Sequence, residues 1–182
     1  MLVCIPKVNS SAESLQKDLT QEEIYQKLSE ISDYYDVGEE LSFDDAEFVK
    51  LYAKTSNSPI MPVKTANVSG SNSNSKISAN LKESVSSNHG IVNNSFGGNV
   101  TTTVTKGTPT KITTKIRHTA YGLVGSGGVG KVQDKTLTAS CTYGKSCTLK
   151  QTYPYTASVA YSTTYAEATI SYSGGALGVT AK

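Results

Sequence analysis

The sequence predicts a mostly β protein, with an antiparallel β-sandwich or small barrel at the C-terminus, preceded by two short amphipathic helices and a Ser/Asn-rich linker. Three observations favour this fold class. Beyond Gly98, segments rich in Thr, Val, Ile and Tyr are separated by glycine-containing turns and show no helical period. The 182 residues leave room for one domain and an appendage. Hydrophobic residues make up 37%, with 3 Phe and 11 Tyr, so we expect a thin core and a wet surface.

Residues 1–12 have features of the end of a secretory signal peptide. An apolar start, Met1 to Ile5, is followed at residues 10–12 by small side chains of the kind that signal peptidases accept. The apolar run is shorter than the roughly 7 to 15 residues of a working signal, so the alternatives are a truncated signal and a chance match. We expect a secreted protein whose mature chain begins near Glu13.

Residues 13–54 are expected to form an acidic segment of two helices. A capping box at Thr20 and Glu23 begins the first helix, and a cap at Ser42 and Asp45 begins the second. Apolar stripes this narrow bury little by themselves, so the helices must pack on each other, on the β-domain or on a partner. The apolar positions are Ile24, Leu28, Ile31 and Tyr35 in the first helix and Phe48, Val49, Leu51 and Tyr52 in the second, with residues 36–40 as the turn between them.

Residues 55–98 have the composition of a linker. Ser and Asn dominate this stretch, and Pro59 and Pro62 interrupt it. We therefore predict a flexible connection between the helices and a cationic β-domain that spans residues 99–182.

The β-domain is predicted to contain six or seven short antiparallel strands, joined by glycine-containing turns. With no helix between the strands, a sandwich or a small barrel is the expected arrangement. The predicted strands are Val100–Lys106, Thr110–Val124, Lys131–Tyr143, Ser146–Thr152, Tyr155–Thr163, Tyr165–Ser173 and Ala176–Ala181.

The segment from Thr110 to Tyr121 has the clearest strand pattern, because its residues alternate strictly between two sides. One side is largely apolar and needs a second layer to cover it. The other side carries three cations within seven residues, so we expect it to face solvent or an anionic partner. The two sides are Ile112, Thr114, Ile116, His118 and Ala120, and Lys111, Thr113, Lys115, Arg117, Thr119 and Tyr121.

Cys141 and Cys147 enclose five residues, the length of a hairpin tip. In an exported protein this spacing suits a cross-strand disulfide, which would contribute about 2 to 3 kcal/mol for so short a loop. A structural zinc site is disfavoured because no His is adjacent, and the gap is too wide for a CxxC redox pair. Cys4 is then the odd cysteine.

The glycine-rich segment from Gly125 to Lys131 matches the spacing of a phosphate-binding P-loop. Such a loop must open a helix and be followed by a hydroxyl residue. Here Val132 takes the place of the hydroxyl residue, and the chain continues as a predicted strand. We interpret the segment as a hairpin connection and predict that the protein binds no nucleotide.

Catalytic side chains are sparse. The histidines are His89, in the predicted linker, and His118, on the apolar side of a strand, where we interpret it as a packed residue. The carboxylates beyond Glu83 are Asp134 and Glu167, and no nucleophile motif accompanies them. We therefore predict a protein that is not an enzyme and holds neither a metal nor a cofactor.

The charges are divided unevenly along the chain. Up to Glu83 there are 13 acids and 8 bases, whereas beyond it there are 2 acids and 9 bases. Cations mixed with tyrosines suit an anionic bacterial envelope, an acidic polysaccharide or a membrane surface, although lysines on strands also prevent sheet edges from pairing. Nucleic acid is a poorer candidate because no reading helix is visible. The predicted surface-binding residues are Lys111, Lys115, Arg117, Tyr121, Lys131, Lys135, Lys145 and Lys150.

The segment SDYYDVGEELSFDDAEFVKLYA, residues 32–53, resembles the acidic helical pro-regions of small secreted proteins of Gram-positive bacteria, including bacteriocin-like precursors. The resemblance implies a precursor whose acidic helices precede a separately acting C-terminal domain. We therefore expect a secreted, non-enzymatic β-domain that binds an envelope or another anionic surface as an antimicrobial or toxin-like effector. The alternative is a structural or adhesive extracellular module without toxicity.

Overall fold

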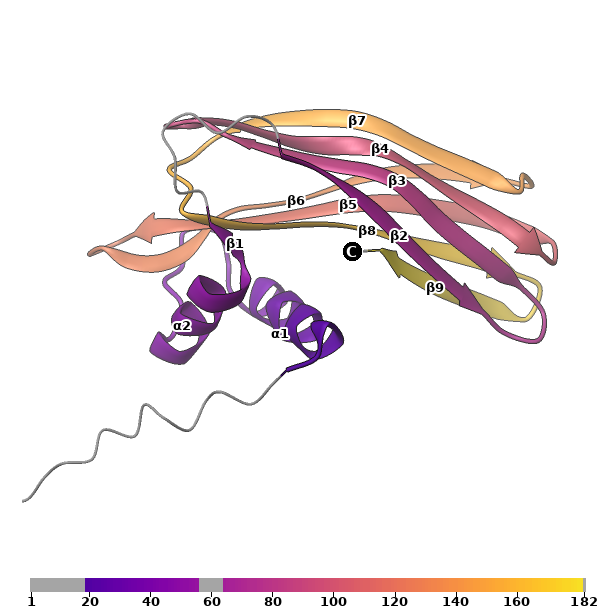
Figure 1. Cartoon of the computed structure of the whole chain (residues 1–182), viewed down its shortest axis with the longest axis horizontal. Coiled ribbons are helices and arrows are strands. Elements are labelled where there is room, and N and C mark those ends of the chain that lie inside the picture. Colours follow the sequence, from indigo (N-terminus) through magenta and orange to yellow (C-terminus); the bar gives the residue numbers. More distant parts are fainter. Residues whose placement is uncertain (1–18, 56–63, 182) are drawn as a thin grey trace, which may run out of the picture.

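The computed structural model describes residues 19–55 and 64–181 and has two antiparallel sheets that face each other, with two helices at one end (Figure 1). The predicted mostly β class, with antiparallel sheets and two short N-terminal helices, is confirmed. The elements are α1 (Gln21–Tyr34), α2 (Phe43–Tyr52), β1 (Lys54–Thr55), β2 (Lys64–Ser73), β3 (Ser78–His89), β4 (Asn93–Lys106), β5 (Pro109–Val124), β6 (Gly128–Thr142), β7 (Ser146–Thr156), β8 (Tyr161–Tyr172) and β9 (Gly175–Ala181).

Each sheet has a simple strand order. Sheet A runs β1-β8-β5-β6, with β9 also paired to β8, and sheet B runs β2-β3-β4-β7. The facing sides of the two sheets form the main core, in which Leu81, Val100, Ile112, Ile116 and Ile170 are fully buried. The alternation predicted for β5 therefore holds on its core side.

The predicted linker is wrong over the described residues 64–98. This stretch forms β2, β3 and the first part of β4, which are most of sheet B. Ser and Asn occupy alternate positions that face solvent, while Val68, Leu81 and Val85 occupy the positions between them and are buried. The predicted boundary at residue 99 consequently falls inside β4, and residues 99–182 lack β2, β3 and the first part of β4. The predicted signal segment, residues 1–12, lies outside the described residues.

The strand boundaries near residues 152–165 also differ from the prediction. The chain forms one strand from Ser146 to Thr156 and another from Tyr161 to Tyr172. The intervening residues, 157–160, cross from sheet B to sheet A. Tyr, Thr and Ser continue through this crossover, so composition alone did not mark it.

The predicted cysteine pair is at disulfide distance, with Cα atoms 5.6 Å apart. Its setting differs from the predicted hairpin tip. Cys141 lies near the end of β6 in sheet A, and Cys147 lies near the start of β7 in sheet B. The disulfide therefore joins the two sheets and does not join two paired strands.

The helices begin at the predicted caps and pack on the outer face of sheet A (Figure 1). Thr20 and Glu23 form a full capping box, and the Ser42 hydroxyl accepts a hydrogen bond from the Asp45 amide. A second apolar cluster joins Ile31, Tyr35, Leu41, Ala46, Val49 and Ala53 of the helical segment to Tyr121 of β5. Leu51, assigned to the apolar side of the second helix, is instead 73% exposed.

The glycine-rich segment is the predicted hairpin connection, between β5 and β6. Its turn residues Gly125 and Gly127 have positive φ angles of 53° and 108°. The next glycines, Gly128 and Gly130, leave room for the α1–α2 connection. This connection pairs with the outer edge of β6 through the amides of Gly38, Leu41 and Lys131. A Cβ atom at Gly130 would lie 2.3 Å from the carbonyl oxygen of Glu39, so glycine is needed for this approach.

Candidate functional site

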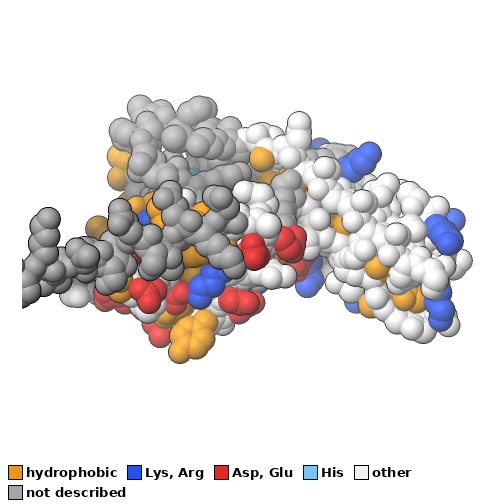
Figure 2. Space-filling view, turned by 60° about the horizontal axis from the view of Figure 1, so that its bottom comes forward, with side chains coloured by type: hydrophobic (Ala, Val, Ile, Leu, Met, Phe, Trp, Pro, Cys, Tyr) orange, Lys and Arg blue, Asp and Glu red, His pale blue; other side chains and the backbone are white. Residues whose placement is uncertain are grey.

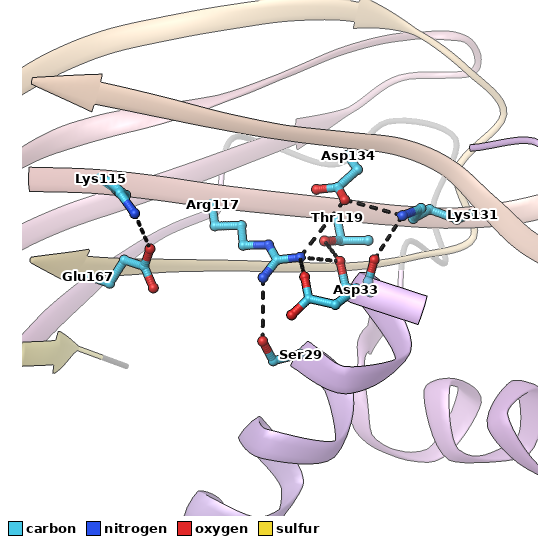
Figure 3. A network of polar contacts seen from close by, with 9 residues as sticks. Ser29, Asp33, Lys115, Arg117, Thr119, Lys131, Asp134 and Glu167 are labelled. Carbon is cyan, nitrogen blue, oxygen red and sulfur yellow. Dashed lines mark hydrogen bonds and ion pairs between the residues drawn. The ribbon is translucent and has the colours of Figure 1, made fainter. Parts of the chain in front are cut away.

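The predicted cationic face of β5 is partly covered by α1. The guanidinium group of Arg117 donates hydrogen bonds to the hydroxyl groups of Ser29 and Ser32 and forms an ion pair with Asp33, all on α1 (Figure 3). Its Nη2 atom also lies 3.9 Å from Oδ2 of Asp134 on β6. The Arg117 side chain is 16% exposed, so its contacts are made within the molecule.

Lys131 lies in the same contact between α1 and sheet A. Its ammonium group donates to the backbone carbonyl of Ser32 and lies 3.2 Å from Asp134, and the residue is 4% exposed. Tyr121 is fully buried in the helix–sheet cluster. The prediction that Lys131 and Tyr121 lie on an exposed surface is therefore wrong, because the helices cover both. We call the contacts of Arg117, Lys131, Asp134 and α1 the helix–sheet network.

The other predicted cations lie elsewhere on the sheets. Lys115 forms an ion pair with Glu167 on the neighbouring β8, at 3.2 Å. Lys135 lies above the Tyr153 ring, with its Nζ atom 5.4 Å from the ring centroid. Lys150 is exposed on the outer face of sheet B. The structure brings Arg117 and Lys131 together but spreads these three lysines over different faces.

Lys111 and Lys145 lie at the end of the sandwich opposite the helices. Four turns meet there, at residues 74–77, 106–111, 142–146 and 172–175, and we call them the turn end. The strand registers place them together, because Ser78 pairs with Lys106, Thr103 with Ser146, and Lys111 with Thr142.

Contacts between the four turns hold the turn end together. Asn74 donates to the Tyr172 hydroxyl at 3.0 Å, and Lys106 donates to the carbonyl of Ser75 at 3.2 Å. The amide of Tyr143 donates to the carbonyl of Thr110. Beside these contacts Lys76, Lys106, Lys111 and Lys145 are exposed, and Tyr143 is 88% exposed. The four turn segments contain no acidic residue.

The acidic side chains gather at the opposite end. The described helical segment, residues 19–55, contains ten acids and three lysines. Figure 2 shows acidic side chains over the helices and basic side chains at the far end of the sandwich. The molecule therefore has an acidic helix end and a cationic turn end, which agrees with the charge division read from the sequence.

Sequence reasoning missed Lys76 and Lys106, which belong to the turn end but were not among the predicted binding residues. The sequence carried one signal for these residues, because a lysine lies in or beside each of three turns, at residues 74–77, 106–111 and 142–146. That signal could not be used, because residues 74–77 were assigned to the linker and the register that joins the turns is a property of the folded sheets.

Both histidines are buried between the sheets near the helix end. His118 has its Nδ1 atom 2.7 Å from the Thr164 hydroxyl and its Nε2 atom 2.9 Å from the Tyr155 hydroxyl. Burial, together with the nearby His89, lowers the pKa of His118 to about 3. The interpretation of His118 as a packed residue agrees with this position. His89 is not in a linker, because it ends β3 and is 8% exposed.

Within the described ranges 19–55 and 64–181, no three His, Cys, Asp or Glu side chains converge as metal ligands would, and no helix is long and apolar enough to cross a membrane. Comparison of the chain with protein-family models, with curated proteins and with solved structures finds no match.

Proposed function

We propose that the protein is a secreted, non-enzymatic effector whose turn end binds an anionic surface, such as a bacterial envelope or membrane, with antimicrobial or toxin-like consequences. The observation that carries the proposal is the turn end itself. Four exposed lysines and an exposed Tyr143 lie at this end of the sandwich, and the turn segments hold no carboxylate that would compete for the lysines. A tyrosine beside lysines suits the boundary between water and an anionic lipid or polymer layer.

The expected strength of such binding follows from the number of cations. Each lysine near an anionic lipid surface contributes about 1 kcal/mol, so four contribute about 4 kcal/mol, which corresponds to a Kd of about 1 mM. Contact by Tyr143 would add to this energy. Arg117 and Lys131 add little in this state, because the helix–sheet network already engages them. A dense anionic surface, which can contact all four lysines of one molecule, is therefore a better partner than a single small anion.

The test uses the full chain and vesicles with and without an anionic lipid. The double variant Lys106→Gln/Lys145→Gln should bind anionic vesicles about 30-fold more weakly than the unchanged chain, which corresponds to about 2 kcal/mol. The matched control, Lys82→Gln/Lys150→Gln, removes the same charge from the outer face of sheet B and should have a much smaller effect. Vesicle co-sedimentation at low salt measures both.

An equal loss in both double variants would contradict a specific role for the turn end and would indicate a response to net charge alone. Growth inhibition of bacteria by the unchanged chain, reduced in the Lys106→Gln/Lys145→Gln variant, would support the toxic form of the proposal. Binding without any inhibition would favour the adhesive alternative.

A second candidate, the adhesive module, is favoured by a hollow on the outer face of sheet B. This hollow has a volume of about 380 Å³ and its lining contains no acidic side chain. Hydroxyl and amide groups with one ammonium group would suit a sugar that carries an acid group. Binding to immobilised polygalacturonate tests this candidate. Binding that persists in the Lys106→Gln/Lys145→Gln variant but is lost in the Ser84→Val/Thr152→Val variant would favour the adhesive module. The lining residues are Thr65, Ser84, Ser86, Gly98, Asn99, Lys150, Gln151 and Thr152.

A further inference from the structure

The two histidines of the chain come from different sheets and meet in the interior. His89 ends β3 in sheet B, and His118 lies in β5 of sheet A. Their ring centroids are 6.0 Å apart with an angle of 24° between the planes. Phe96 of β4 stacks on the His118 ring at 4.4 Å. The chain therefore places both of its histidines, the residue type whose ordinary pKa is nearest to neutral pH, at one junction between its sheets.

The contacts of His118 suit a neutral imidazole and supply no charge to balance a positive one. His118 contacts the hydroxyl groups of Thr164 and Tyr155, and the Nε2 atom of His89 lies 2.9 Å from the Ser162 hydroxyl. A hydroxyl group can donate to one imidazole nitrogen and accept from another, so these contacts fit the neutral ring. They do not supply the negative charge that a buried imidazolium needs.

The groups that contact the His118 ring from β4, β7 and β8 are uncharged at neutral and acidic pH, whereas β6 contributes a lysine. β4 contributes Phe96, β8 contributes Ser162 and Thr164, and β7 contributes Tyr155, while Tyr153 packs on Phe96. Burial raises the pKa of Tyr155, so its hydroxyl stays protonated. Lys135 of β6 is the register partner of His118, and its ammonium group lies above the Tyr153 ring. A proton added to His118 would therefore meet an apolar, hydroxyl-lined site, a second imidazole and a lysine on the paired strand.

We infer that the His89–His118 pair is an acid-sensitive latch between the two sheets, and that protonation of the pair opens the helix end of the sandwich while the turn end stays closed. The turn end has its own connection between the sheets, the Cys141–Cys147 disulfide, and contains no histidine. Acid would thus loosen one end of the molecule before the other. The segments expected to open are the last residues of β3, the first residues of β4 and the last residues of β7.

The direction of the pH effect follows from the two states. In the unfolded chain a histidine has a pKa of about 6.5, whereas the pKa of His118 in the folded protein is about 3. Stability from the neutral ring is fully present above pH 6.5 and is lost progressively as the pH falls from 6.5 towards 3. At pH 4.5, two units below the pKa in the unfolded chain, protonation of this one group should lower the folding equilibrium constant about 100-fold relative to neutral pH.

The test measures urea unfolding of the full chain at pH 7.5, 5.5 and 4.5. The unchanged protein should lose about 100-fold in its folding constant between pH 7.5 and pH 4.5, and His118→Gln should be less stable at pH 7.5 but lose much less on acidification. His89→Gln is the second variant, in case His118→Gln does not fold. Asp33→Asn is the control for a carboxylate contribution and should keep the acid sensitivity. An unchanged pH dependence in both histidine variants would overturn the proposal.

Hydrogen exchange, corrected for the intrinsic pH dependence of the rate, tests where the molecule opens. At pH 5 the amides near His89, in the first part of β4 and in the last part of β7 should exchange faster relative to pH 7.5 than those beside the Cys141–Cys147 disulfide. Equal acceleration at both ends would show global unfolding and would overturn the local latch. A His118 ring that titrates near pH 6.5 in the folded protein, measured by NMR, would also overturn it.

Discussion

Arg117 joins the helices to sheet A through more partners than any other residue of the helix–sheet network. Burial acts to lower the pKa of its guanidinium group, but the hydrogen bond to Asp33 and the nearby acidic groups raise that pKa above its ordinary value. The Arg117 side chain is 16% exposed, whereas that of Asp33 is 64% exposed. The energy of the network therefore depends more on the arginine than on this partner, because water screens and replaces an exposed carboxylate.

Arg117→Ala should lower the free energy of unfolding by about 2 kcal/mol, since it removes several charge-assisted hydrogen bonds and leaves Asp134 with fewer partners. Asp33→Asn should cost less than about 1 kcal/mol. Arg117→Lys should fall between them, because an ammonium group cannot reproduce the planar fork of the guanidinium group. Urea unfolding at pH 7.5 measures all three. A larger loss in Asp33→Asn than in Arg117→Ala would contradict this order.

At the scale of elements, the connection between α1 and α2 depends on the glycines of β6. A Cβ atom at Gly130 would lie 2.3 Å from the backbone oxygen of Glu39 and 2.2 Å from a methyl carbon of Val124. At Gly128 the close atoms belong to the side chain of Glu40, which can rotate away. The two glycines are therefore unequal, although both lie in the same glycine-rich segment.

Gly130→Ala should destabilise the protein by about 1 to 3 kcal/mol, because the backbone of the α1–α2 connection must move. Gly128→Ala is the matched control and should have little effect. Thermal unfolding measures the loss, and limited proteolysis should cut residues 36–41 faster in the first variant than in the second. If both variants lose the same stability, the close approach at Glu39 is not what requires glycine.

The elements show what the sequence could and could not reveal. Both helix starts were predictable, because capping residues act locally at Thr20 and Ser42. The strand β2 was not recognised, since its core positions are Ala66, Val68 and Gly70, small residues with a weak alternation among Ser and Asn. Its strand character comes from pairing with β3, and such pairing depends on partners rather than on intrinsic propensity.

The candidate site was predictable in its charge but not in its place. The excess of bases beyond Glu83 indicated a cationic surface, and Lys111 and Lys145 proved to be exposed at the turn end. An exposed surface was expected for Arg117, Tyr121 and Lys131, because the helices were treated as separate from the β-domain. An alternating strand pattern shows which side a residue faces, but it does not show whether another element covers that side.

At the scale of the whole molecule, the Cys141–Cys147 disulfide connects the two sheets at the turn end. Replacing both cysteines by alanine should lower the free energy of unfolding by about 2 to 3 kcal/mol, because the unfolded chain loses a constraint on a short loop. The expected fall in Tm is about 4 to 12 °C for a domain of this size. Circular dichroism should show unchanged strand content. Two alkylatable thiols in the native unchanged protein would contradict the disulfide.

The separation of charge between the ends has a consequence for the approach of the protein to the anionic surface that we propose as its partner. A molecule with acids at one end and lysines at the other carries a permanent dipole along its long direction, and a negatively charged surface exerts a torque on it during diffusion. The turn end should therefore arrive first, with the helices pointing away into solvent. Productive collisions would then be more frequent than shape alone permits, and the landing molecules would share one orientation.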